Sequence, residues 1–137
     1  MNTPEYFEQV GSRGFYRPVG TATFEQAVEM VAAVMKNARA QGLADLLVNV
    51  CGLSGFASPN VYERHDLAVK WAESAGRALR VALVVRSEMM DPKKIAVLMA
   101  QNRGASGDAF LTEADALAWL DGNLSRTTGG VSTLKPS

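Results

Sequence analysis

Two short apolar segments, LLVNV at 46–50 and VALVV at 81–85, constrain the fold of this chain most strongly. Apart from Asn49 neither contains a polar residue, which is typical of strands buried on both faces of a parallel sheet. A segment with helical spacing, residues 58–76, lies between them and implies a right-handed crossover that joins the two strands in parallel. We therefore expect both segments to lie side by side in a single sheet covered by helices.

Cap and turn residues predict the remaining elements. Two aromatic-rich strands at 6–10 and 15–19 flank the turn sequence GSRG and are expected to form an antiparallel hairpin. Thr23 and Gln26 have the spacing of a capping box for a helix over 23–42. Ser58 is expected to cap the next helix, with Pro59 at its first position and Gly76 at its end.

The second half of the sequence repeats the alternation of helix and strand. Asp91 is expected to cap a helix over 91–104, a strand follows at 108–111, and Thr112 begins a last helix over 112–120. The order is β-β-α-β-α-β-α-β-α, which predicts an α/β protein with a single mixed, mostly parallel sheet. The domain is expected to span residues 1–122. Residues 123–137 lack periodicity and are expected to form a flexible tail.

Composition excludes several classes of function. Lys plus Arg equals Asp plus Glu, at 14 each, so there is no electrostatic reason to expect a nucleic acid partner or an anionic membrane. The single cysteine excludes an internal disulfide and zinc sites with several cysteines, and the single histidine excludes an H-E-x-x-H zinc site. No secretory signal and no segment of the ~20 apolar residues of a membrane span is present. We expect a cytoplasmic protein without a cofactor or metal.

Four segments in this order resemble the STAS domain, the fold of anti-sigma factor antagonists, and in particular its SpoIIAA-like branch. They are VGTATFEQAVEMV before and within the first helix, LLVNVCGLSGF, LRVALVV, and the closing AFLTEADALAWL. The resemblance covers roughly residues 5–122. It implies a non-enzymatic regulatory module that binds a protein partner through the loop after the third strand and the start of the second helix.

The resemblance also implies a position for a regulatory phosphate. Regulatory STAS members carry a phosphorylated serine in an Asp-Ser-Ser-Gly motif after the third strand. The matching positions here read FASPNV (56–61), which lacks the aspartate, the paired hydroxyls and the glycine. Ser58 is the nearest hydroxyl and is therefore the candidate phosphoacceptor.

The candidate binding residues are Ser54, Ser58, Asn60, Arg64 and His65. A phosphate on Ser58 would be favoured by the free amides at a helix start. Arg64 projects toward the apolar face of its helix, where it either extends to the surface or binds an anion or a partner's carboxylate. No residue is assigned as catalytic, because GLSGF differs from the G-x-S-x-G motif by one position around Ser54.

Two other functions remain open from the sequence. One is a carrier or sensor of a small apolar or anionic ligand, held between the sheet and its helices. The other is a small hydrolase that uses Cys51 or Ser54 with His65, although a cysteine that ends a buried strand more often serves in packing. Nothing in the residues decides whether the protein forms a homodimer.

Overall fold

The computed structural model describes residues 5–91 and 93–122, so the predicted tail, 123–137, lies outside the described residues. Five strands form one sheet in the order β1-β2-β4-β6-β7. Strand β1 is antiparallel to β2, and the remaining neighbours are all parallel, so the predicted mixed, mostly parallel sheet is confirmed. The strands are β1 (Phe7–Val10), β2 (Arg13–Tyr16), β4 (Asp45–Asn49), β6 (Arg80–Val84) and β7 (Ser106–Phe110).

The two apolar segments are adjacent, as predicted. Strands β4 and β6 pair in parallel over their full length, with Leu47 opposite Ala82 and Val48 opposite Leu83. They occupy the interior of the sheet, where both faces are covered. Leu46, Leu47 and Val81 have no exposed surface. Burial on both faces explains why these segments lack the polar alternation of a half-exposed strand.

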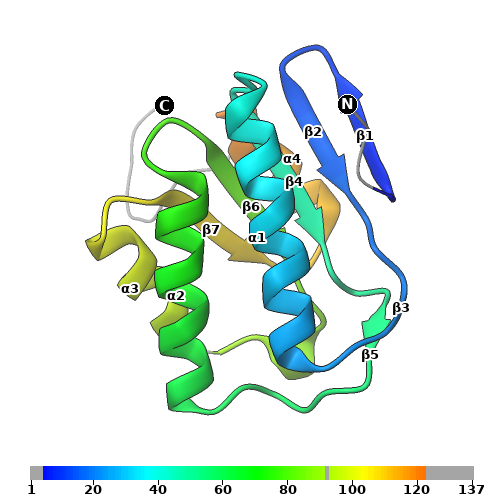
Figure 1. The fold of residues 1–137 in the computed structure, drawn as a ribbon, viewed down its shortest axis with the longest axis vertical. Helices are drawn as coiled ribbons and strands as arrows, with labels where there is room; N and C mark the ends of the chain where they lie inside the picture. The colour runs from blue at the N-terminus through cyan, green and yellow to red at the C-terminus, as the bar shows by residue number, and fades with distance from the viewer. Residues whose placement is uncertain (1–4, 92, 123–137) are drawn as a thin grey trace.

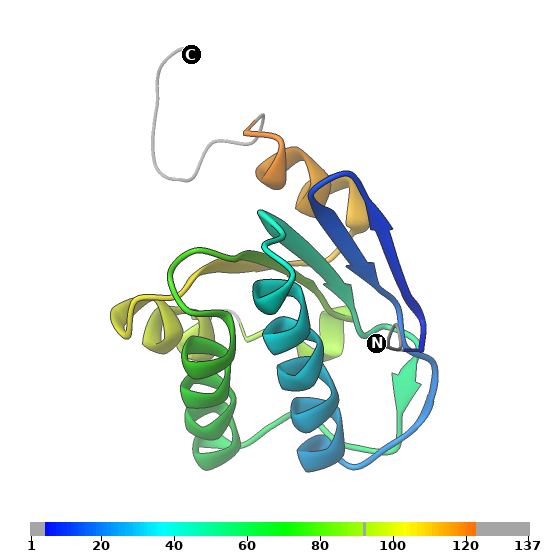
Figure 2. The same cartoon turned by 45° about the horizontal axis from the view of Figure 1, so that its top comes forward.

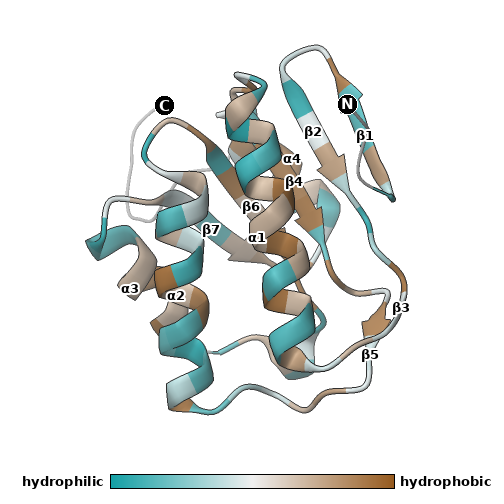
Figure 3. Cartoon of the chain, in the orientation of Figure 1, coloured by the Kyte–Doolittle hydropathy of each residue, from teal (hydrophilic) through white to brown (hydrophobic). Residues whose placement is uncertain are grey.

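Helices cover both faces of the sheet, but unequally (Figures 1 and 2). Helices α1 (Phe24–Ala40), α2 (Val61–Ala75) and α3 (Ile95–Asn102) lie on one face, and α4 (Glu113–Leu120) lies alone on the other. Alternate strand residues serve the two cores: Val81 packs with the three-helix core and Ala82 with the α4 core. Figure 3 shows apolar and hydrophilic residues mixed along α1 and α2, as expected for helices with one buried side.

Gly107 shows how closely α2 approaches the sheet. A Cβ atom at Gly107 would lie 2.5 Å from Cζ2 of Trp71 and 2.6 Å from the carbonyl oxygen of Val81. Because Gly107 has no side chain, the indole of Trp71, which is 1% exposed, can lie directly against the strands at this position. The packing is therefore tight where Trp71 contacts Gly107.

Two predicted helix starts are wrong. Helix α2 begins at Val61, and its cap is Asn60 rather than Ser58, because Asn60 and Glu63 form a reciprocal capping box. Helix α3 begins at Ile95, after Lys94 in a left-handed conformation with φ of 50°, rather than at Asp91. Asp91 still serves the helix start, because its carboxylate accepts a hydrogen bond from the Ile95 amide at 2.8 Å. By contrast, the predicted capping box of α1, formed by Thr23 and Gln26, is confirmed.

A small second sheet was not predicted. Strands β3 (Gly20–Thr21) and β5 (Leu53–Ser54) pair in parallel, with Gly20 opposite Leu53. This pair attaches the beginning of the loop 52–60 to the segment that enters α1. The hairpin also differs from the prediction, because Arg13 and Gly14 belong to β2 and not to the turn.

Candidate binding site at the carboxyl ends of the strands

An apolar cavity of about 120 Å³ lies beside the carboxyl ends of the parallel strands. Val50, which follows β4, and Val85, which follows β6, both line it, and Leu83 and Ala109 contribute from within β6 and β7. Helices α1, α2 and α3 supply the other side. Open α/β sheets typically bind ligands at this edge, outside the carboxyl ends of their strands.

The loop 52–60 forms part of the cavity wall. Phe56 and Pro59 both line the cavity. The ring of Phe56 meets that of Phe24, at the start of α1, with centroids 5.9 Å apart and an edge-to-face angle of 71°. This aromatic contact holds the loop against α1. The loop is therefore both a wall of the cavity and part of the outer surface.

Arg64 lies at the cavity and is the predicted residue that the structure places there. Its side chain is 24% exposed, and its Nε lies 4.0 Å from Oδ2 of Asp91. Asp91 is engaged elsewhere, because its carboxylate accepts hydrogen bonds from the amides of Ile95, at 2.8 Å, and Lys93, at 3.1 Å. These backbone bonds, the Ile95 amide first, lower the pKa of Asp91. The guanidinium of Arg64 is thus only weakly paired.

Two further cations line the cavity, and each has a closer acidic partner. Nε of Arg86 lies 3.2 Å from Glu88. Nζ of Lys94 lies 2.8 Å from Asp108 and donates to the carbonyl oxygen of Ala109 at 3.0 Å. Arg64 is therefore the least neutralised of the three cations around the cavity.

The other predicted binding residues lie outside the cavity. Ser54 is in β5, where its hydroxyl donates to the carbonyl oxygen of Gly20 at 3.4 Å. Ser58 is exposed, and within the described part of the chain its hydroxyl has no hydrogen-bond partner. Asn60 caps α2. His65 is half exposed and lies 3.9 Å from Asp66, in a groove lined by residues of α1 and α2. Their role in binding stays a prediction.

The proposed hydrolase residues do not assemble into a catalytic centre. In the part of the chain that the structure describes, neither Cys51 nor Ser54 forms a hydrogen bond with His65. Burial raises the pKa of the Cys51 thiol, which disfavours the thiolate that a nucleophile needs. Its sulfur instead lies 3.9 Å from the carbonyl oxygen of Val84. This environment supports the packing role that the sequence favoured for Cys51.

A polar cluster that the sequence did not reveal lies at the start of α4. Glu113 accepts hydrogen bonds from Arg17 at 2.8 and 3.0 Å and from the side-chain amide of Asn49 at 2.7 Å. The bond from Arg17, together with that from Asn49, lowers the pKa of Glu113. Asn49 is the one polar residue of its predicted strand, and this exception was the sequence feature that could have indicated the cluster.

Across residues 5–91 and 93–122, no three His, Cys, Asp or Glu side chains gather as they would around a metal ion. None of the helices in those ranges combines the length and apolar character needed to cross a membrane.

Comparison with known proteins gives matches among solved structures alone. No family model matches the chain, and no curated protein matches it. Among solved structures, the anti-sigma factor antagonist SpoIIAA in its unphosphorylated form is similar, with a TM-score of 0.48 and 21% sequence identity. The alignment covers 85% of this chain and 96% of that one. At this level the similarity transfers no residue role to the present chain.

Proposed function

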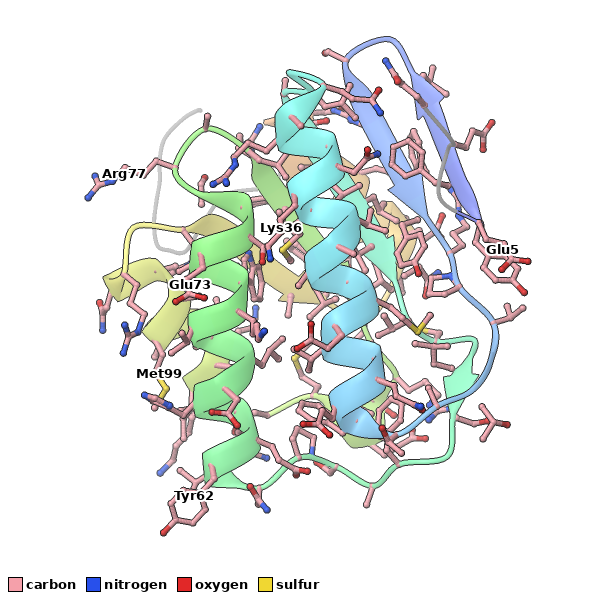
Figure 4. The ribbon with its side chains drawn as sticks, in the orientation of Figure 1. Glu5, Lys36, Tyr62, Glu73, Arg77 and Met99 are labelled. Atoms are coloured by element: carbon pink, nitrogen blue, oxygen red, sulfur yellow. The ribbon has the colours of Figure 1, made fainter. Side chains whose placement is uncertain are left out.

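We propose that this domain is a regulatory module that binds a protein partner through the loop 52–60 and the first turn of α2. The observation that carries the proposal is the exposure of two apolar side chains in that turn. Tyr62 is 79% exposed and Val61 is 52% exposed. Figure 4 shows Tyr62 at the beginning of α2, projecting away from the body of the domain.

The chemistry of this surface suits a protein interface. Tyrosine is enriched at interfaces because its ring buries a large area while its hydroxyl keeps a hydrogen bond. Close to Tyr62 in the sequence are Ser58, which is exposed, and the capping residues Asn60 and Glu63. An apolar anchor with polar neighbours is the arrangement expected of a binding hot spot and its rim.

The same surface gives Ser58 a role as the candidate phosphoacceptor. Its exposed hydroxyl lies two residues before the cap of α2, and it stabilises no part of the fold through a hydrogen bond among the described residues. A phosphate there would add about two negative charges just before the start of α2. We therefore propose that phosphorylation of Ser58 changes partner binding without unfolding the domain.

Capture from native lysate tests the proposal. Immobilised wild-type protein should retain a partner that Tyr62→Ser protein loses. Tyr6→Ser is the matched control, because Tyr6 is also exposed, at 45%, but lies at the start of the β1–β2 hairpin. Ser58→Glu should alter retention of the same partner. Equal capture by wild-type and Tyr62→Ser proteins, or no captured partner, would contradict the proposed surface.

A further inference from the structure

We infer that the cavity beneath the loop 52–60 binds a small amphipathic monocarboxylate, with its apolar part enclosed and its carboxylate held by Arg64. This inference goes beyond the proposed protein partner, because the cavity is distinct from the exposed surface around Tyr62. It rests on three properties of the cavity, namely its size, its apolar walls and the weakly paired guanidinium beside it.

The size of the cavity limits the ligand. Its volume is about 120 Å³. An apolar cavity of about 150 Å³ stays dry and accommodates benzene. The enclosed part of the ligand is therefore about one aromatic ring or an alkyl chain of about six carbons. A bilayer-forming lipid or a nucleotide is too large to fit within this volume.

The walls of the cavity are apolar. Val28 and Val31 of α1, Leu83 of β6, Val97 of α3 and Met90 face it. Water would find few partners among these side chains, because an ordered buried water needs two to four polar contacts. Small residues create the space, since Ala27, Ala96 and Ala109 also line it, from α1, α3 and β7. Alkyl or aromatic carbon fits such a space better than water does.

Arg64 supplies the polar contact. Its guanidinium is largely withdrawn from solvent, and its ion pair with Asp91 spans 4.0 Å. No side-chain hydrogen bond uses its donors within the described ranges. A carboxylate can accept two parallel hydrogen bonds from such a guanidinium. Asp91 also lines the cavity, and its oxygens already accept hydrogen bonds from the amides of Lys93 and Ile95. A bound carboxylate would therefore share the Arg64 guanidinium with Asp91.

A ligand in this cavity would contact the inner side of the loop 52–60, whose outer side belongs to the proposed partner surface. Phe56 and Pro59 line the cavity and belong to the loop 52–60. Arg64 lies on α2, two residues after Tyr62. The bound molecule would therefore add contacts to the loop and to the start of α2.

Isothermal titration of the full chain tests the inference with hexanoate, hexan-1-ol and dodecanoate as probes. Hexanoate should bind at least about tenfold more tightly than hexan-1-ol, because only the carboxylate makes charge-assisted hydrogen bonds. Dodecanoate should gain nothing from its longer chain. Equal binding of acid and alcohol, much tighter binding of dodecanoate, or no heat at millimolar hexanoate would each overturn the inference.

Two pairs of variants locate the site. Arg64→Gln should weaken hexanoate binding about tenfold and leave hexan-1-ol binding unchanged. Arg77→Gln is its control, because Arg77 projects into solvent at the other end of α2 (Figure 4). Ala96→Leu should weaken both probes by filling the cavity, whereas Ala118→Leu, on α4, should weaken neither. Unchanged hexanoate binding by Arg64→Gln or Ala96→Leu protein would contradict the site.

The outcome can be separated from that of the partner proposal. Tyr62→Ser protein should bind hexanoate like the wild type, since Tyr62 is 79% exposed and does not line the cavity. Loss of hexanoate binding in this variant would contradict the separation of the two sites. Thermal unfolding of each variant shows whether it is folded before its binding is compared.

Discussion

The two faces of the sheet are built from the same strands but are closed differently. On the α4 face, the rings of Phe110 and Trp119 lie with centroids 5.7 Å apart, and the guanidinium of Arg80 lies 4.6 Å above the Trp119 ring. On the other face, three helices cover the strands, yet a cavity remains beside the strand ends. The two faces thus differ at the strand ends, where the cavity lies on the side of the three helices.

This difference shows that the cavity is a local property and not a sign of a loose core. On the three-helix face, Trp71 packs tightly against Gly107, and the same side chain also lines the cavity together with Ala27, Ala96 and Ala109. We conclude that the α4 face mainly stabilises the fold. The hollow end of the opposite face, with the loop 52–60 beside it, is the region that we propose for binding.

The largest expected effect is that of a substitution in the core on the α4 face. Trp119→Ala removes a side chain that is 6% exposed and the ring that contacts both Phe110 and Arg80. The free energy of unfolding should fall by about 3–5 kcal/mol, as measured by urea denaturation. Leu111→Ala is a control, because Leu111 is 50% exposed, and should cost less than about 0.5 kcal/mol. Similar losses in both variants would contradict the role assigned to this face.

A substitution of Arg80, with a smaller expected effect on stability, isolates the contribution of its guanidinium. Its guanidinium donates to the carbonyl oxygens of Leu120, at 2.9 Å, and Trp119, at 3.0 Å, and so caps the carboxyl end of α4. Arg80→Met keeps most of the aliphatic stem and should lower the free energy of unfolding by about 1–2 kcal/mol. The same change at exposed Arg77 should have no measurable effect in the same denaturation assay. An equal cost at both positions would argue against the cap.

The next prediction compares two neighbours in the binding region. Asn60→Ala removes the cap of α2 and should lower the free energy of unfolding by about 1 kcal/mol. Ser58→Ala should change it by less than about 0.5 kcal/mol, because Ser58 does not cap the helix. Parallel thermal or urea unfolding curves decide between them. A larger loss of unfolding free energy for Ser58→Ala than for Asn60→Ala would indicate that Ser58 caps the helix, as the sequence predicted.

The smallest effect concerns pH. The folded-state pKa of Glu113 is lowered, so its ionised form stabilises the protein above the ordinary value near pH 4.5. This contribution is lost as pH falls through the lowered pKa. Glu113→Gln should therefore be less stable than the wild type at neutral pH, by less than about 1 kcal/mol, and the difference should shrink in acid. Urea denaturation across this pH range measures it. A difference that grows in acid would reverse the assigned sign.

The parts of the fold that the sequence predicted are those with local causes. The apolar runs 46–50 and 81–85 carry no polar alternation, and Thr23 with Gln26 forms a local box, so β4, β6 and the start of α1 were identified correctly. At α2 the sequence offered two caps. Ser58-Pro59 has the usual spacing, but Asn60 is the residue that bonds reciprocally with Glu63. Two adjacent local signals compete there, and only the observed geometry separates them.

The candidate site was less predictable, because it depends on contacts between distant segments. Arg64 was identified, since a cation on an apolar helical face is costly to bury unpaired. The cavity was not located, because it arises where side chains of three helices, two strands and the loops after the strands meet. The β3–β5 pair has the same origin, as it joins residues 33 positions apart, Gly20 and Leu53. Two-residue strands carry too little pattern to be recognised.

The most direct test of the difference between the faces is an amide NMR titration of the full chain with hexanoate. The account predicts shifts that saturate at Val50, Leu83 and Val97 and in the loop 52–60, with none across α4. Saturating shifts centred on α4, or no saturating shift at any residue, would contradict the assignment of stability to one face and binding to the other.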